Sequence, residues 1–556
     1  MKKPQLSLHE SGHLCTPHTG DIRIALAFPN TYHVGMSNLG FQIIYRQLNR
    51  CPDVSCERAF LPDGKIIKHQ ESSRMALASL ESRQPLNSFH IIAFSVSFET
   101  DYLNILTMLR LAHLDVLRTA RRARDPLIIG GGVSLFLNPE PLADIFDVCI
   151  IGEGEEIIEE VLDVIRQEQP ARQWKKPDLK AFAHIKGVYV PAGYNVTYHP
   201  HGTIKSFSPL PGFPPTITRR WIADLDRFSG SSCIITPDTE FGDMKLVEVS
   251  RGCPRRCRFC AIGMVYRPYR LRSLQCLEHE ALFGPPVNNR IGLLGSAVGD
   301  HPELTALVQW IAEQGGTVSV SSLRADTLSE ELVERLQESR HFSYTIAPET
   351  GSERLRRVIA KDLTNAEIFS AVALLARHKI ARIKLYFLIG LPTERDEEIE
   401  AIIDLSRRVR HVYYKEAGGQ QWLRQISISV SIFIPKPATP FQWHAFADVG
   451  ELKRKLKKIR QGLKKEQKIV MTHEIPKWAY IQALLSRGDR RTSAFLIKAF
   501  ETGGDWGRAL REVPLNPEFY VSRQRSREEL LPWDFINHGV TKDALWEEYQ
   551  TALQQH

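Results

Sequence analysis

The sequence predicts an α/β protein in three parts: a flavodoxin-like doubly wound sheet, a partial (β/α)6 barrel and a helical carboxyl-terminal region. Short apolar, β-branched runs alternate with helical segments in two separate series, and such runs are missing toward the carboxyl end. A chain of 556 residues is also too long for one ordinary core. We expect a first domain at 1–165, a linker at 166–240, the barrel at 241–445 and the helical region at 446–556. The linker is expected to contain a hairpin around 187–206.

The first series contains five βα units. Its strands are expected at 22–29, 54–60, 89–98, 126–134 and the start of 147–165. Parallel strands buried on both faces read as apolar runs of this kind. In a doubly wound sheet, ligands bind beyond the carboxyl ends of the strands, which is where the glycine-rich turns of this segment fall.

The second series contains six βα units, which is enough to curl a sheet into a partial barrel. Its strands are expected at 244–250, 290–296, 317–322, 342–347, 382–390 and 425–434. Amphipathic helices such as 329–339 and 397–409 lie between them. A ligand site is expected on the rim formed by the carboxyl ends of these strands.

The composition is that of a folded protein, with 43% hydrophobic and 24% charged residues. No apolar run approaches the ~20 residues that a membrane helix needs, and the basic start "MKKPQLSLHESGHLC" has no apolar segment of a secretory signal. We therefore expect a cytoplasmic protein with no membrane contact. The nine cysteines are then candidates for metal ligation or burial rather than for disulfides.

The net charge of +8 is concentrated in one segment, because 451–468 holds nine basic residues against two acidic ones. Apolar residues recur there at helical spacing: Leu452, Leu456, Ile459 and Leu463. A packed helix with a solvated basic face explains this pattern most simply. Contact with RNA through 451–468 is the alternative.

Three cysteines fall within "RGCPRRCRFCA" (251–261), directly after the first barrel strand. They are Cys253, Cys257 and Cys260. Structural zinc sites use four ligands, commonly as two C-x2-C pairs, and a redox dithiol needs only two cysteines. Three thiolates instead match an iron–sulfur cluster that leaves one iron without a protein ligand. The spacing therefore predicts a cluster that can bind and activate a further molecule.

This motif resembles that of the radical S-adenosylmethionine (radical SAM) superfamily, C-x3-C-x-aromatic-C, with Phe259 at the aromatic position. The resemblance implies a 4Fe–4S cluster that reductively cleaves SAM to a 5′-deoxyadenosyl radical, fed by an external electron donor such as flavodoxin or ferredoxin. It also implies a SAM site at residues that follow the barrel strands: Phe259, Gly295, Ser322, Arg324 and Glu349. The arginines of this segment, Arg251, Arg255, Arg256 and Arg258, could tune the cluster or hold SAM, but most are expected to face solvent.

The first domain resembles the cobalamin-binding domain of cobalamin-dependent radical SAM enzymes. The likeness lies in "NTYHVGMSNLG", "SVS", "GGG" and the P-E-P-L and G-E-G-E elements of 138–155. It implies cobalamin held through His33, Ser95, Gly130 and Gly131. The base-off motif D-x-H-x-x-G is altered here to N-T-Y-H-V-G, so ligation of cobalt by His33 is the less secure part of this expectation.

"SIFIPKPATPFQW" and "PWDFINHGV" extend the likeness to a bacterial family of cobalamin-domain radical SAM proteins with unknown substrates. Methyl transfer from cobalamin to an unactivated carbon is the expected chemistry, and no catalytic residue is assigned. One alternative is oxidation, rearrangement or sulfur insertion without cobalamin. Methylthiotransferases need a second three-cysteine site upstream, which Cys15, Cys51, Cys56 and Cys149 do not clearly supply. Another alternative is a redox-sensing, nucleic-acid-binding cluster protein.

Overall fold

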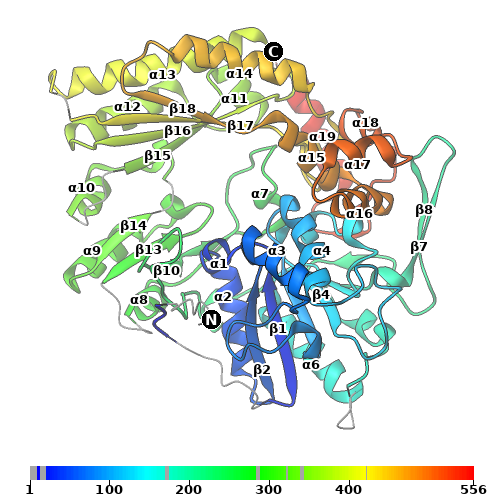
Figure 1. Cartoon of the computed structure of the whole chain (residues 1–556). Helices are drawn as coiled ribbons and strands as arrows, with labels where there is room; N and C mark the ends of the chain where they lie inside the picture. The colour runs from blue at the N-terminus through cyan, green and yellow to red at the C-terminus, as the bar shows by residue number, and fades with distance from the viewer. Residues whose placement is uncertain are drawn as a thin grey trace.

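The computed structural model describes residues 9–12, 20–168, 174–282, 289–320, 323–338, 343–420 and 422–555. An amino-terminal sheet, a curved set of barrel strands and a carboxyl-terminal group of helices pack together around the middle of the molecule (Figure 1). The predicted α/β class with a helical carboxyl-terminal part is confirmed. No helix in the described part of the chain is both long and apolar enough to cross a bilayer.

The amino-terminal sheet has the strand order of the flavodoxin type, β2-β1-β3-β4-β5, with β6 added at one edge. The first five strands pair in parallel, and β6 is antiparallel to β5. The strands are β1 (Ile22–Phe28), β2 (Val54–Phe60), β3 (Ile91–Ser95), β4 (Leu127–Gly131), β5 (Val148–Ile150) and β6 (Val188–Tyr189). The helices of this part are α1 (Tyr32–Met36), α2 (Leu39–Arg50), α3 (Gly64–Ser73), α4 (Tyr102–Leu111), α5 (Val133–Leu137) and α6 (Gly154–Glu168).

All six predicted barrel strands form, and they pair in parallel within two sheets. The first sheet holds β10 (Lys245–Glu248), β13 (Arg290–Leu294) and β14 (Thr317–Val320). The second holds β15 (Ser343–Glu349), β16 (Arg382–Ile389), β17 (Gln425–Ile432) and β18 (Ile469–His473). The helices beside these strands are α8 (Leu274–Leu282), α9 (Leu304–Glu313), α10 (Glu330–Glu338), α11 (Glu353–Val358), α12 (Asn365–Arg377), α13 (Asp396–Glu416) and α14 (Val449–Leu463).

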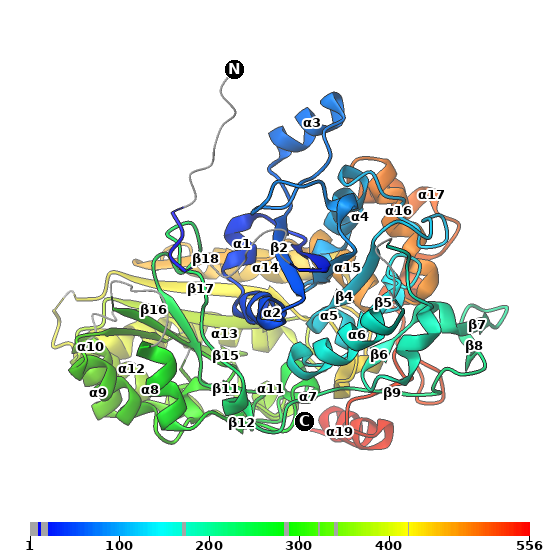
Figure 2. The same ribbon diagram turned by 90° about the horizontal axis from the view of Figure 1, so that it is seen from below.

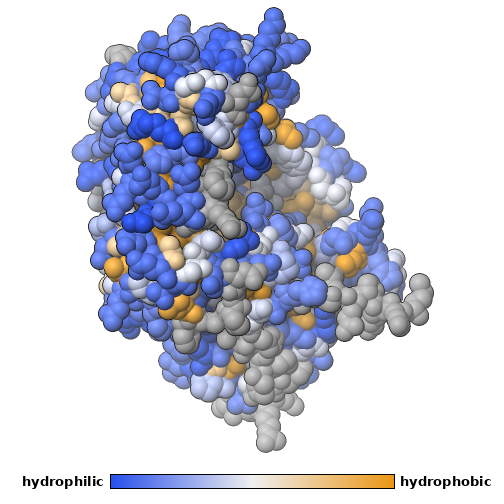
Figure 3. Space-filling model, turned by 90° about the vertical axis from the view of Figure 1, so that its left-hand side faces the viewer, coloured by the Kyte–Doolittle hydropathy of each residue, from blue (hydrophilic) through white to orange (hydrophobic). Residues whose placement is uncertain are grey.

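The face of the molecule in Figure 3 is mostly hydrophilic, with apolar residues in small groups.

The strand β18 was not expected, because the carboxyl-terminal region was predicted to be helical from residue 446. It pairs in parallel with β17, and α14 is the crossover helix between them. β18 is hard to recognise in the sequence because none of its residues is fully buried. They alternate between half-buried and exposed positions, as on an edge strand. The parallel sheet therefore continues past the expected boundary at residue 445.

The basic helix α14 packs as its apolar spacing predicts, with Leu452, Leu456, Ile459 and Leu463 buried. Several of its cations pair with acidic groups of neighbouring elements. Arg454 pairs with Asp396, Lys455 with Glu394 and Lys458 with Glu400. These ion pairs account for part of the charge within the fold, and RNA contact through 451–468 stays a prediction.

The carboxyl-terminal helices pack against the amino-terminal domain, as the second view shows for α4 and α16 (Figure 2). These helices are α15 (Pro476–Arg487), α16 (Ser493–Glu501), α17 (Trp506–Glu512), α18 (Pro517–Val521) and α19 (Lys542–Gln554). Glu140 forms a buried ion pair with Arg490, and the side chain of Asn138 donates to the carbonyls of Ser486 and Gly488. The P-E-P-L element, expected near a corrin ring, therefore holds the carboxyl-terminal region in place.

The linker forms the expected hairpin, shifted along the chain. Its strands are β7 (Tyr194–Tyr198) and β8 (Ile204–Pro209), which pair antiparallel. The start of the predicted hairpin instead joins the amino-terminal sheet as β6. A second short strand of the linker, β9 (Ile217–Thr218), pairs with β19 (Ile536–Asn537) near the carboxyl end.

Candidate active site

The three cysteines lie in one loop that leaves the first barrel strand. Two short antiparallel strands, β11 (Ser250–Arg251) and β12 (Arg270–Leu271), close the base of this loop. Gly252 opens the loop with a φ of +86°, and a Cβ there would lie 2.4 Å from the carbonyl oxygen of Tyr266. Glycine is the residue that tolerates both conditions. The strand pair and this glycine therefore fix where the cysteine loop begins and ends.

The thiols of Cys253, Cys257 and Cys260 are partly accessible and influence one another electrostatically. Burial raises the pKa of Cys257 to about 11, against the opposing charge of Lys361. Burial also raises the pKa of Cys260, although backbone N–H groups in the first turn of α7 (Ile262–Val265) donate to its sulfur. Iron would take the place of these protons. Three thiols on one short loop, one of them with backbone N–H donors, fit a cluster with one open iron.

A hollow of about 350 Å³ opens beside Phe259, at the carboxyl ends of β15, β16 and β17. Glu349 and Tyr386 line it together with Phe259. Glu349 has a φ of +65°, and its carboxylate accepts a hydrogen bond from the Lys361 ammonium at 3.1 Å. Burial raises the pKa of Glu349, although Lys361 acts in the opposite direction. Strained, partly buried and charged residues of this kind gather where ligands bind.

The other residues expected at SAM do not all face this hollow. Arg324 lies close enough to Cys257 for the two to interact electrostatically, but its guanidinium donates to Asp326 at 2.8 and 2.9 Å. Gly295 lines a different and larger cavity, which lies between the amino-terminal sheet and the cysteine loop. Ser322 lies outside the described residues. The structure thus brings Phe259 and Glu349 together, and it places Gly295 elsewhere.

A buried network of ion pairs joins the amino-terminal domain to the base of the cysteine loop. Arg251 pairs with Glu153 at 3.2 Å, with Glu155 at 2.8 Å and with Glu248 at 2.9 Å. Arg270, on the strand that closes the loop, makes two hydrogen bonds to Glu153 at 2.7 and 2.8 Å. The G-E-G-E turn of the first domain therefore clamps both ends of the loop that carries the cysteines.

The remaining arginines between the cysteines differ in their surroundings. Arg258 is buried and pairs with Glu548 at 2.8 Å. Arg255 pairs with Asp300. Arg256 is exposed. The expectation that most arginines of the motif face solvent is correct for Arg256 alone, because the other three have acidic partners that are distant in the sequence.

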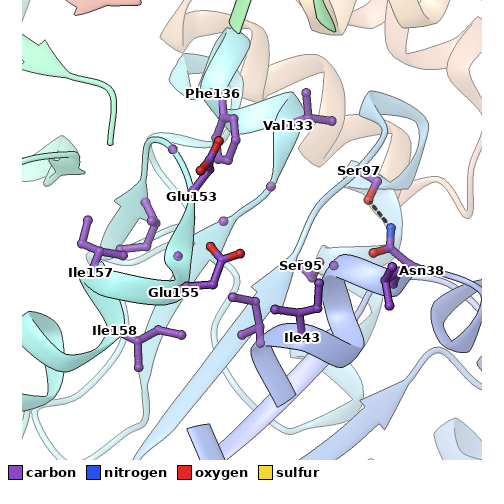
Figure 4. Close-up of a pocket in the computed structure, with 18 of the residues that line it drawn as sticks. Asn38, Ile43, Ser95, Ser97, Val133, Phe136, Glu153, Glu155, Ile157 and Ile158 are labelled. Carbon is purple, nitrogen blue, oxygen red and sulfur yellow. Dashed lines mark hydrogen bonds between the residues drawn. The ribbon is translucent and has the colours of Figure 1, made fainter. Parts of the chain in front are cut away.

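A cavity of about 620 Å³ lies between the amino-terminal sheet and the cysteine loop. Its walls come from the carboxyl ends of β3 and β4, from α2 and α6, and from Arg251 and Gly252 at the base of the loop. In Figure 4, apolar side chains such as Ile43 and Ile158 surround it, with the carboxylates of Glu153 and Glu155 at one side. Both carboxylates are already paired with arginines, so neither brings an uncompensated charge to this apolar cavity.

The residues expected to hold cobalamin are only partly in this cavity. Ser95 and Gly131 line it, and a Cβ added to Gly131 would meet nothing nearer than Ile150 at 3.7 Å. Gly130 does not line it, because its Cα faces Leu135 and Phe146. The bare backbone at Gly131 and the apolar walls fit a large, flat organic cofactor.

His33 lies away from this cavity. Its imidazole is exposed and lies 3.6 Å from the carboxylate of Glu240. No histidine is found among the described residues that line the cavity. The short helix α1 carries His33 outward, so in this structure the residue does not face the cavity, and its ligation of cobalt stays a prediction.

Two comparisons with known proteins agree with this geometry. Residues 247–406 match the family described as "Radical SAM superfamily", and residues 40–191 match "Radical SAM proteins, N-terminal". An uncharacterized protein of Methanocaldococcus jannaschii is 31% identical over 477 residues, which cover 85% of this chain and 90% of that relative. The chain belongs to the radical SAM superfamily.

Other similarities are more distant. The ribosomal protein uS12 methylthiotransferase RimO of a Thermoanaerobacter species is 25% identical over 333 residues, covering 57% of this chain and 69% of that protein. Among solved structures, the radical S-adenosylmethionine methyltransferase TsrM of Kitasatospora setae is 14% identical with a TM-score of 0.47, covering 73% of this chain and 72% of that one. Membership of the radical SAM superfamily implies a 4Fe–4S cluster and SAM as cofactors of this chain.

A second cluster of the methylthiotransferase kind is not formed by the upstream cysteines that the structure describes. Cys56 lies on β2 and Cys149 on β5, at opposite sides of the parallel sheet. Four strand spacings of about 4.8 Å separate these strands, roughly 19 Å. Cys51 is buried and donates to the carboxylate of Glu159. Cys15 lies outside the described residues.

Some polar residues of this site were missed by sequence analysis. Lys361, which binds Glu349, follows it by 12 positions across a helix, with no motif to mark it. Lys436 lines the hollow beside Phe259 and pairs with the buried Glu99 of the first domain. Gln482 donates to the same carboxylate at 3.0 Å. Lys436 lies within "SIFIPKPATPFQW", where no local pattern marks it as a partner of a residue in the first domain.

Proposed function

We propose that this radical SAM enzyme is cobalamin-dependent and transfers a methyl group to an unactivated carbon of its substrate. The observation that carries the proposal is the cavity of about 620 Å³ whose walls include both the strand ends of the flavodoxin-type domain and the base of the cysteine loop. A cofactor held there would lie next to the cluster. When bound, the cluster supplies an electron for SAM cleavage and cobalamin supplies a transferable methyl group.

The residues of this chain bind and orient rather than react. Ser95 and Gly131 offer a hydroxyl and bare backbone at the cavity wall, where a corrin edge can approach. The apolar side chains of α2 and α6 exclude water from that space. The Arg251 network keeps the cysteine loop at a fixed position relative to it. On the other side of the loop, Phe259 and Glu349 bound the hollow that suits SAM.

The test is a cavity-filling variant, Gly131→Leu, compared with Gly64→Leu as a matched control. Gly64 begins the peripheral helix α3, and a Cβ there meets nothing within 4 Å. Both proteins are purified anaerobically with added hydroxocobalamin, and corrin absorbance and iron are measured per chain. We expect wild type and Gly64→Leu to retain close to one corrin, and Gly131→Leu to lose most of it while keeping its iron.

Equal corrin retention by Gly131→Leu and the control would contradict this placement of the cofactor. The reaction itself is tested by incubating reduced protein with SAM and measuring 5′-deoxyadenosine. Formation of 5′-deoxyadenosine by a wild-type protein that retains no corrin would favour radical chemistry without methyl transfer. Mass spectrometry of small molecules and RNA from a deletion strain would then identify the missing product.

A further inference from the structure

A second hollow borders the cysteine loop, and none of the residues in its wall lines the large cavity or the hollow beside Phe259. It has a volume of about 470 Å³ and includes Cys253 in its wall. Segments that are far apart in the sequence build it: the linker, the cysteine loop, the turn before β12 and the end of β19. The residues of this wall that carry charge are Arg219, Arg256 and Arg267.

Arg219 is the most unusual group in this wall. It is only 4% exposed, and its Nη2 donates to the carbonyl of Arg267. Its Nε and Nη1 are buried without a hydrogen-bond partner in the part of the chain that the structure describes. A buried guanidinium with unused donors costs several kcal/mol unless something binds it.

Among the described residues, no carboxylate forms an ion pair with Arg219. Burial lowers its pKa, and Glu153 opposes this shift from a distance. The Glu153 oxygens are already occupied by Arg270, by Arg251 and by the backbone N–H of Ile222. The Nε and Nη1 donors of Arg219 are therefore left without a partner among the described residues and are available to a bound ligand.

Two more guanidinium groups share the hollow. Arg256 is exposed, and the Nε of Arg267 donates a hydrogen bond to the carbonyl of Gly263 at 2.7 Å. The charge of Glu548 acts electrostatically on Arg267, but the Glu548 carboxylate forms its ion pair with Arg258. Three arginines thus line a hollow whose described wall contains no aspartate or glutamate.

We propose that this hollow binds a phosphate group, either as the free anion or as part of a small phosphorylated molecule. Guanidinium groups bind phosphate oxygens through paired, charge-assisted hydrogen bonds, and three of them can match its charge of about −1.5 to −2 at neutral pH. The amide of Asn537 is a further donor in the same wall. Because Cys253 borders the hollow, the bound group lies next to the cluster loop.

The experiment is calorimetric titration of the anaerobic, cluster-loaded full chain with inorganic phosphate and, separately, with ribose 5-phosphate, at constant ionic strength. The variants are Arg219→Met and Arg256→Gln. The control is Lys457→Gln, which removes one positive charge from an exposed position of the basic helix α14. Arg256→Gln is included because Arg256 is exposed, so its loss leaves the fold intact, whereas Arg219 is buried.

We expect saturable binding to wild type and to Lys457→Gln, and a Kd raised at least tenfold in Arg219→Met and Arg256→Gln, as loss of a charge-assisted hydrogen bond gives. Tighter binding of ribose 5-phosphate would identify a sugar phosphate as the source of the group, and equal or tighter binding of inorganic phosphate would identify the free anion. Unchanged affinity in Arg256→Gln, or no saturable binding of either ligand to wild type, would overturn the proposal.

Discussion

Replacing Glu153 with glutamine tests whether the ion-pair network fixes the cysteine loop. Glu153 accepts two hydrogen bonds from Arg270 at 2.7 and 2.8 Å and one from the backbone of Ile222 at 2.8 Å, and it pairs with Arg251 at 3.2 Å. No other carboxylate pairs with Arg270 among the described residues, so the variant leaves this cation buried without its counter-charge. Breaking a buried pair in this way costs about 3–5 kcal/mol.

For a domain of ordinary size, each kcal/mol lowers Tm by about 2–4 °C, so Glu153→Gln should lower the Tm of the domain by about 6–20 °C. Glu155→Gln should cost less, because Arg251 keeps Glu153 and Glu248 as partners. Glu160→Gln is the control: Glu160 pairs with Arg220 at 2.6 Å near the surface, where such pairs contribute about 0–1 kcal/mol.

The assay is anaerobic thermal unfolding followed by circular dichroism, with iron and sulfide measured per chain. Iron content should fall in Glu153→Gln and stay at the wild-type level in the Glu160→Gln control. A Glu153→Gln protein with the Tm and iron content of that control would refute the role of the network.

The pH dependence gives a second check on Glu153. Burial acts to raise its pKa, but the hydrogen bonds from Arg270 and the charges of Arg251 and Arg270 outweigh burial and hold the pKa below the ordinary value of 4.5. A lowered folded-state pKa means that the stabilisation is fully present above about pH 4.5 and is lost as the pH falls below it. The Tm difference between wild type and Glu153→Gln should therefore shrink below about pH 4.5. A difference that stays constant down to pH 3 would contradict the assignment.

Further predictions concern the cysteine loop and the hollow beside Phe259. Gly252→Ala should lower iron content per chain severalfold, because a Cβ would lie 2.4 Å from the Tyr266 carbonyl at a φ of +86°; normal iron content would show that the loop adapts. Cys257→Ala should retain almost no iron and form no 5′-deoxyadenosine, and full SAM cleavage by this variant would exclude Cys257 as a ligand. Lys361→Met should keep its cluster, seen by electron paramagnetic resonance, yet bind SAM about tenfold more weakly, because the buried Glu349 loses its cationic partner; unchanged SAM affinity would assign Lys361 to folding alone.

Residues close together in the sequence made much of the site predictable. Cys253, Cys257 and Cys260 are within eight positions, so their spacing alone indicated the cluster. Phe259 came with the same motif, and the glycine at 131 followed from a turn at the end of an apolar strand. Sequence motifs were a poorer guide where the role of a residue depends on contacts with distant parts of the chain. His33 lies in a loop that only partly resembles the base-off motif, and its helix directs it to Glu240 and away from the cavity.

The buried pairs could not be foreseen from the sequence. Arg251 is separated from Glu153 and Glu155 by about a hundred positions, and nothing local distinguishes an arginine that is buried and paired from one that faces solvent. The same holds for Arg219, whose unused donors become visible only when the linker meets the cysteine loop.

The amino-acid order by itself determined the two series of strands, the apolar stripe of α14 and the three thiols, because hydrophobic periodicity and ligand spacing are properties of neighbouring residues. Tertiary packing decided that α14 leads to a further sheet strand, that the G-E-G-E turn clamps the cysteine loop, and that the cavity lies against that loop. Those outcomes depend on which distant charges and apolar faces come together when water is excluded, and that is a property of the whole fold.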